Sequence, residues 1–192
     1  MAQQKMEFTK VYQWLKENQS RRKILTAATQ PMTAKQLSRK TGIPPDTCSH
    51  TLRKFTSKGQ AVCLNPKSRT SRLYQLTELG IRCQKQVYQD SNHPYKEYNL
   101  PDIDWQLYGW VCFNHRCSVI KTLITPLQPS EIKRILRVHR PNIKISANNI
   151  RDIIKLFLAK AIVRPVKLRK KAHLRYELTE LGDQFRQLLV RV

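Results

Sequence analysis

The feature that most constrains this chain is an internal repeat. Leu-Thr-Glu-Leu-Gly at residues 76–80 recurs without a change at residues 178–182. At the same offset Phe55 aligns with Phe157, and the neighbouring apolar positions again fall on apolar positions. Self-similarity at a fixed distance is the signature of a duplicated structural unit. We therefore expect two copies of one folded unit rather than a single domain with a tail.

The repeat also sets the expected domain boundaries. Residues 30–31 align with residues 128–129 at a smaller offset, so the second copy has gained residues in its connecting loops, where insertions are tolerated. This alignment places the copies at residues 6–88 and 104–192. Residues 89–103, which contain two prolines and several acidic residues, form the expected linker.

Each copy has the residue pattern of three helices, the first of them in two segments, followed by a strand hairpin and a final helix. In the first copy, Thr33 is a suitable N-cap, Gly42 and Gly59 suit helix C-termini, and Thr77 suits the start of the last helix. The expected elements of the first copy are helices at 11–15, 22–28, 34–40 and 44–58, strands at 61–64 and 73–76, and a helix from residue 78. The predicted fold class is thus mainly α with small β-hairpins (α+β).

The second copy follows the same order with two departures. Ser130, Ser146 and Thr179 are its expected N-caps, and a basic turn at residues 167–173 joins its strands. Its segment between the second and third helices is longer. Ala161 also stands where the first copy has Gly59.

Charge indicates the kind of partner. The 36 Lys and Arg residues against 13 Asp and Glu residues give a formal net charge of +23, which favours a polyanion. No apolar run reaches the roughly 18 to 20 residues of a membrane span, and the first eight residues lack the apolar core of a secretory signal. The expected partner is nucleic acid, with no membrane, and the expected location is cytoplasmic, associated with the nucleoid.

The pattern within each copy resembles the winged helix-turn-helix domains of bacterial and archaeal transcriptional regulators. The resemblance rests on the short helix and glycine turn at residues 36–43, on the third helix, and on the basic hairpin leading to each Leu-Thr-Glu-Leu-Gly phrase. It covers almost the whole chain as two tandem domains. In such a fold the third helix enters the major groove and the hairpin, or wing, follows the DNA backbone.

The resemblance assigns a DNA-binding set to each copy. In the first, the groove-facing residues would be Asp46, Ser49, His50 and Arg53, and the wing residues would be Lys67, Arg69 and Arg72. In the second, the corresponding sets are Asn148, Asn149, Arg151 and Lys155, then Lys167, Arg169, Lys170 and Lys171. Arginine and asparagine can bind base edges in a bidentate manner, whereas wing lysines mainly neutralise phosphates.

The resulting functional hypothesis is a sequence-specific regulator of transcription that binds double-stranded DNA, acts as a repressor and forms a homodimer. One alternative is a replication initiator of the plasmid type, which also uses tandem winged helices. Another is a module in which one winged helix binds DNA and the other dimerises or docks on a protein. RNA binding is a weaker alternative.

No pattern for catalysis or for a cofactor is present in the sequence. The acidic residues are scattered, and the sequence lacks a phosphate-binding glycine loop and a metalloprotease motif. The five cysteines are an odd number without a close CxxC pair, so we interpret them as reduced side chains. A metal or redox role for Cys112, His115 and Cys117 is an alternative, although their spacing matches no closed zinc pattern. Trp14 and Trp110 recur in the two copies, either as core residues or at an interface.

Overall fold

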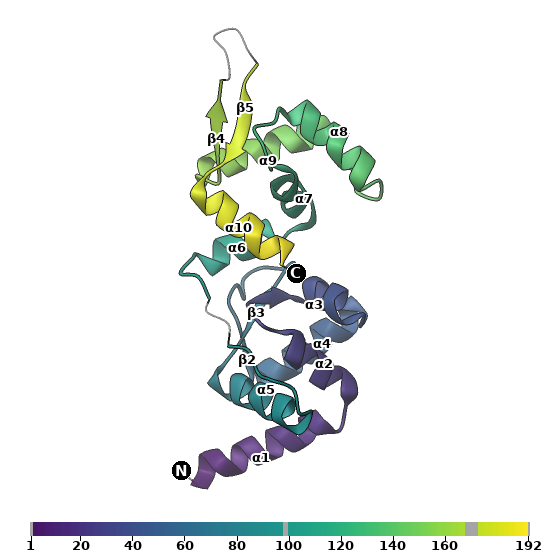
Figure 1. Cartoon of the computed structure of the whole chain (residues 1–192), viewed down its shortest axis with the longest axis vertical. Coiled ribbons are helices and arrows are strands. Elements are labelled where there is room, and N and C mark those ends of the chain that lie inside the picture. Colours follow the sequence, from purple (N-terminus) through teal and green to yellow (C-terminus); the bar gives the residue numbers. More distant parts are fainter. Residues whose placement is uncertain (1, 98–99, 168–172, 192) are drawn as a thin grey trace. The chain divides into compact units, whose positions relative to one another are not determined.

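The computed structural model describes residues 2–97, 100–167 and 173–191 of the chain. It is mainly helical with small antiparallel sheets, which confirms the predicted fold class at that level (Figure 1). The chain divides into two compact units between Trp110 and Val111. This division falls inside the range 104–192 that the repeat assigns to the second copy.

The first unit, called unit 1 here, contains the helices and strands expected for the first copy in the expected order, and one additional short strand. Its elements are α1 (Ala2–Lys16), α2 (Gln19–Ala27), β1 (Met32–Thr33), α3 (Ala34–Thr41), α4 (Pro45–Ser57), β2 (Ala61–Cys63), β3 (Leu73–Leu76) and α5 (Glu78–Asp90). A short helix, α6 (Trp105–Val111), ends at the division between the units.

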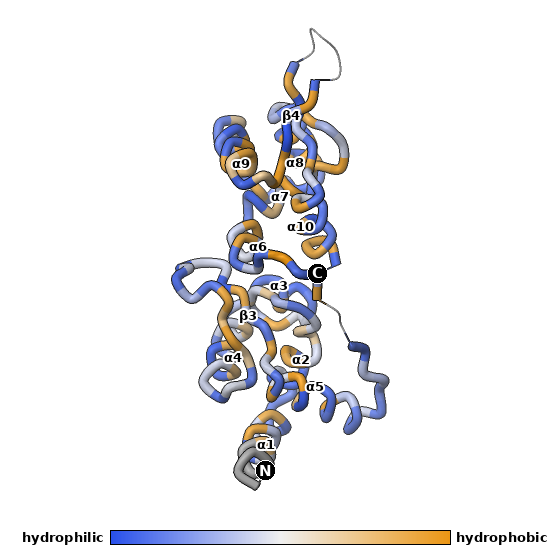
Figure 2. Tube along the Cα trace, turned by 90° about the vertical axis from the view of Figure 1, so that its left-hand side faces the viewer, coloured by the Kyte–Doolittle hydropathy of each residue, from blue (hydrophilic) through white to orange (hydrophobic). Residues whose placement is uncertain are grey.

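The helices of unit 1 enclose one apolar core. Leu15, Ile24, Leu37 and Phe55 come from four helices and are all fully buried. Trp14 packs edge-on against Phe55 with ring centroids 6.1 Å apart, so this tryptophan belongs to the core region of its unit. Along the tube of Figure 2, hydrophilic and hydrophobic residues alternate within the helices, as expected of helices that bury one face.

A short strand, β1, was not predicted. It pairs antiparallel with β3, with Met32 opposite Tyr74, and gives a three-stranded sheet in the order β1-β3-β2. Sequence reasoning placed only a turn at residues 30–31. A two-residue strand has no periodicity of its own, because its existence depends on a pairing partner far along the chain.

The second unit, called unit 2 here, repeats the order of unit 1 from α2 to α5, with an isolated bridge in place of β1. Its elements are α7 (Asn114–Thr122), α8 (Pro129–His139), α9 (Ala147–Ala159), β4 (Val163–Val166), β5 (Arg175–Leu178) and α10 (Glu180–Val190). An isolated bridge between Leu127 and Tyr176 stands where unit 1 has the pairing of Met32 with Tyr74. The hairpin of β4 and β5 extends away from the helices of unit 2 (Figure 1).

The start of α8 differs from the prediction. Ser130 was expected to cap this helix, but it lies in the first turn, and Gln128 is the N-cap residue. The backbone N–H of Gln128 donates to Glu131 Oε2 at 2.7 Å. In unit 1 the backbone N–H of Thr33 likewise donates to Gln36 Oε1 at 2.8 Å. Gln128 therefore corresponds to Thr33, and the alignment of residues 128–129 with residues 30–31 was wrong.

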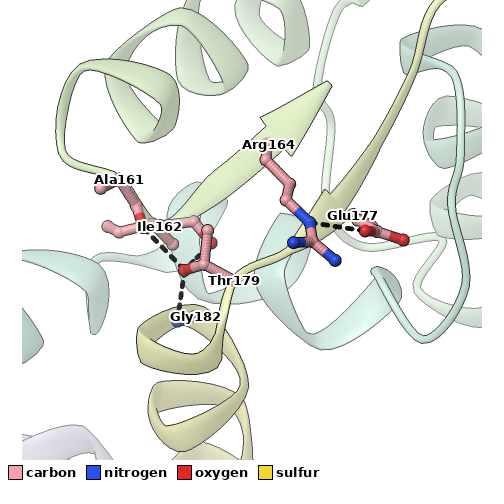
Figure 3. Close-up of polar contacts among 6 residues, drawn as sticks. All are labelled: Ala161, Ile162, Arg164, Glu177, Thr179 and Gly182. Atoms are coloured by element: carbon pink, nitrogen blue, oxygen red, sulfur yellow. Dashed lines mark hydrogen bonds and ion pairs between the residues drawn. The ribbon is translucent and has the colours of Figure 1, made fainter. Parts of the chain in front are cut away.

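The repeated Leu-Thr-Glu-Leu-Gly phrase makes the same hydrogen bonds in both units. Thr77 accepts from the backbone N–H of Gly80 at 3.2 Å and donates to the carbonyl of Gly59 at 2.5 Å. Thr179 likewise accepts from Gly182 at 3.2 Å and donates to Ala161 at 2.6 Å (Figure 3). The threonine thus caps the last helix and connects it to the backbone two residues after the end of α4 or α9. This contact fixes the base of the hairpin against the helices.

The glycines of the phrase are required by close packing. A Cβ atom on Gly80 would overlap the carbonyl oxygen of Gln60, and a Cβ atom on Gly182 would overlap that of Ile162. The same carbonyls accept from the backbone N–H groups of the two capping threonines at 3.0 Å. The last helix of each unit therefore approaches the start of the hairpin at a distance that only glycine permits.

Candidate nucleic-acid interface

Helix α4 of unit 1, which corresponds to the predicted third helix, presents a polar face opposite its buried stripe. Cys48, Leu52 and Phe55 are buried, and at most 1% of the surface of each is exposed to solvent. Asp46, Ser49, His50 and Arg53 lie on other faces of the helix. Ser49 is half-buried, whereas the other three side chains are exposed. The structure thus leaves three of the four predicted groove-facing residues fully available to a ligand.

The turn before α4 is held in a defined conformation. Gly42 ends α3 with a φ of +74°, a left-handed backbone that glycine adopts at low cost. The Cys48 thiol donates to the carbonyl of Ile43 at 3.6 Å, and burial raises the pKa of this thiol. Cys48 therefore acts as a neutral packing residue that joins the turn to α4. This arrangement sets the direction in which α4 leaves the turn.

The turn of the first hairpin, at residues 65–72, is ordered by its own hydrogen bonds. Asn65 accepts from the backbone N–H of Leu73 at 2.7 Å and donates to the carbonyl of Ser71 at 3.2 Å. Arg72 Nε donates to the carbonyl of Ser68 at 3.0 Å, so part of this guanidinium stabilises the turn. Lys67 and Arg69 are exposed, and neither has an ion pair within the described ranges. Of the three cations predicted for the wing of unit 1, these two remain available.

The third helix of unit 2, α9, begins as predicted. Ser146 is its N-cap and accepts from the backbone N–H of Asn149 at 3.1 Å. The four residues predicted to face the groove, Asn148, Asn149, Arg151 and Lys155, are all exposed.

Contacts along α9 distinguish the members of this set. Asn148 Oδ1 accepts from Arg151 Nη1 at 3.1 Å, and Lys155 lies 4.0 Å from a carboxylate oxygen of Asp152. A bidentate contact to adenine needs both the oxygen and the nitrogen of an asparagine amide. Because Asn148 already uses its oxygen, Asn149 is the better candidate for contact with a base.

Both strands of the unit 2 hairpin take part in ion pairs. Arg164 of β4 pairs with Glu177 of β5 at 2.7 Å (Figure 3). Arg175 of β5 pairs with Glu131 of α8 at 2.7 Å and donates to the carbonyl of Pro126 at 2.8 Å. The second contact ties the hairpin to the helix that precedes α9.

The predicted wing residues of unit 2 are described only in part. Lys167 is exposed directly after β4. Arg169, Lys170 and Lys171 lie outside the described residues. The assignment of these three residues to the wing stays a prediction.

Three basic residues near α9 were not predicted as site residues. Lys133 and Arg137 of α8 and Lys144 of the following segment line a cleft beside the first turn of α9. The spacing of Lys133 and Arg137 places them on one face of a helix, and this was the available signal. The approach of Lys144 to that face depends on the path of the chain between two helices.

The alternative metal site receives no support from the geometry. Within the part of the chain that the structure describes, no group of three or more His, Cys, Asp or Glu side chains is placed to hold a metal ion, so Cys112, His115 and Cys117 do not form one. None of the five cysteines is in a disulfide. Among the described helices, none is both long and apolar enough to cross a membrane.

The functional assignment of these surfaces rests on the geometry of this chain. Both units place an exposed polar helix face beside a hairpin whose turn carries basic residues. Each face carries one arginine, Arg53 or Arg151, but the faces differ otherwise, with an aspartate and a histidine on α4 and two asparagines on α9. Comparison with protein-family models, with curated proteins and with solved structures finds no match to this chain.

Proposed function

We propose that this protein is a regulator of transcription that binds double-stranded DNA through two tandem winged helix-turn-helix domains. In each domain the third helix, α4 or α9, enters the major groove and the hairpin contacts the sugar-phosphate backbone. The observation that carries the proposal is the same arrangement of exposed helix face and basic hairpin in two units of one chain. The net charge of +23 agrees with a polyanionic partner.

The division of roles follows from the side chains. Arg53 and Asn149 are exposed on the third helices and can form bidentate hydrogen bonds with guanine and adenine, respectively. Lys67 and Arg69 stand on a hairpin turn and would neutralise phosphates, which contributes affinity but little sequence preference. We assign repression and a homodimeric form to the protein as part of this proposal, because two-fold operators match two-fold proteins.

The proposal is tested by enrichment of random duplex DNA on the purified full-length protein. We expect a defined motif. Arg53→Ala and Asn149→Ala should each relax the preference at different base positions, with a loss of about 1–3 kcal/mol of discrimination per contact. Lys23→Ala, an exposed residue of α2, serves as the control and should leave the motif unchanged.

Two results would contradict the proposal. Binding that is indifferent to sequence in the wild type would exclude a sequence-specific regulator. A motif unaffected by both third-helix substitutions would exclude these helices as the elements that contact bases. A motif made of several direct repeats, without two-fold symmetry, would favour a replication initiator over a dimeric repressor.

A further inference from the structure

Unit 2 contains a basic cleft beside the first turn of α9. The cleft has a volume of about 450 Å³ and lies among α8, residues 140–146 and the first turn of α9. Its polar lining consists of Lys133, Arg137, Lys144, Ser146 and Asn149. Three positively charged side chains from two separate segments therefore converge on one site.

The charge of the cleft is not neutralised by nearby carboxylates. Among the described residues, no acidic side chain lines it. The two nearest acidic residues along the helices that form it, Glu131 and Asp152, pair with Arg175 and Lys155 instead. Like charges that converge without a counter-ion repel one another, so an anionic ligand would relieve a repulsion that the protein maintains.

The cleft is formed mainly by residues of unit 2 that have no counterpart in unit 1. Helix α8 has 11 residues against eight in α3, and its added turn carries Arg137. The connection to the third helix is residues 140–146 in unit 2 and residues 42–44 in unit 1. The shorter connection of unit 1 contains no basic residue. The added residues thus supply most of the lining of the cleft and two of its three positive charges.

We propose that this cleft binds a phosphate group, and that the backbone of the duplex held by α9 supplies it. The inference rests on the proposed function. Asn149 lines the cleft and also belongs to the groove-facing set, so a strand entering the groove at α9 would pass the cleft. The first turn of α9 adds the partial positive charge of a helix N-terminus.

The form of the cleft favours a backbone phosphate over a free metabolite. Sites for small molecules are mostly apolar and bury most of the ligand. This cleft opens to solvent and presents lysine and arginine side chains. Such a surface suits a polymer that passes along it and leaves most of its atoms in solvent.

The test uses three single substitutions in the full-length protein. Arg137→Gln and Lys144→Gln each remove one charge from the cleft. Arg134→Gln removes the same charge from an exposed residue of α8 that does not line the cleft, and is the matched control. Affinity for a generic duplex is measured from about 50 to 200 mM salt, a range over which phosphate contacts are resolved by their salt dependence. Amide NMR shifts of α9 are recorded in parallel during titration with inorganic phosphate.

Each cleft variant should lower the slope of log affinity against log salt by about 0.9, the contribution of one phosphate contact, while Arg134→Gln should leave the slope unchanged. If the cleft variants match Arg134→Gln while Lys67→Gln lowers the slope, the cleft inference is wrong and the proposed function stands. If the wild type does not bind duplex but phosphate shifts the α9 amides in an Arg137-dependent manner, the duplex is not the source and the proposed function fails.

Discussion

Ala161 holds the left-handed backbone conformation that Gly59 holds in the other unit, with φ values of +52° and +70°. This conformation costs a residue with a Cβ atom about 1–2 kcal/mol, partly offset by the lower entropy cost of fixing alanine. We therefore expect Ala161→Gly to raise the free energy of unfolding by about 1 kcal/mol. Urea denaturation of the full-length protein measures it.

Gly59→Ala is the reciprocal control for that prediction. A Cβ atom there would meet only Leu79 at 3.9 Å, an ordinary contact, so backbone strain is the main expected effect. It should lower stability by about 1 kcal/mol. If Ala161→Gly instead lowers stability, the backbone at position 161 is not strained and the correspondence with position 59 is wrong.

Gly80 and Gly182 are expected to be less tolerant than Gly59. Because an added Cβ would overlap a backbone carbonyl oxygen, Gly80→Ala and Gly182→Ala should each cost about 2–3 kcal/mol. Gly42→Ala separates strain from overlap, since its φ is +74° but no atom lies within 4 Å of the added Cβ. Thermal unfolding of the three variants should rank Gly42→Ala as the mildest. An equal loss in all three would exclude close packing as the role of the repeated glycine.

At the scale of elements, the ion pair of Arg175 with Glu131 connects the second hairpin to α8. The hydrogen bond from the backbone of Gln128, followed by the charge of Arg175, lowers the pKa of Glu131 from its ordinary value of 4.5. A carboxyl group whose pKa is lowered on folding contributes stability above its unfolded pKa and loses it as pH falls through the folded value. Glu131 should therefore stabilise unit 2 at neutral pH and not in strong acid.

Glu131→Gln tests this connection, because glutamine can still accept the helix-capping bond but carries no charge. We expect a loss of about 1 kcal/mol at pH 7 that disappears as the pH falls well below 4.5. The measurement is urea denaturation at several pH values. A loss that is the same at every pH would mean that the side chain acts through packing and not through its charge.

The elements that were predicted correctly are those whose signals are local. The N-caps Thr33, Thr77, Ser146 and Thr179 are confirmed, because a cap depends on a side chain and the backbone two or three residues later. Ser130 was assigned wrongly because the helix begins earlier, with Gln128 as the N-cap residue and its backbone N–H bonded to Glu131.

The features that sequence analysis missed depend on distant parts of the chain. Strand β1 exists through its pairing with β3, and the basic cleft exists because Lys144 returns toward Lys133 and Arg137. The exposed faces of α4 and α9 were predictable, since helical periodicity separates them from the buried stripe. The internal bond of Asn148 with Arg151 was not, because either side chain has other rotamers available.

At the scale of the whole molecule, the net charge of +23 attracts any polyanion, so affinity for DNA does not by itself identify a binding surface. Two double variants that lose the same number of charges at different places distinguish the effect of where a charge lies from the effect of total charge. Lys67→Gln with Arg69→Gln removes the available wing cations of unit 1. Lys10→Gln with Lys23→Gln removes two exposed lysines from α1 and α2.

The wing variant should lower the salt slope of duplex binding by about 1.8, because two phosphate contacts are lost, while the α1 and α2 variant should change it little. Interactions beyond about 8 Å are screened at physiological salt, so the two lysines can affect affinity only where they lie near the bound duplex. Fluorescence anisotropy with one labelled duplex over a series of salt concentrations measures both slopes. Equal slopes for the two variants would mean that overall charge, and not the hairpin, holds the DNA, and the assignment of the hairpin as a wing would then be withdrawn.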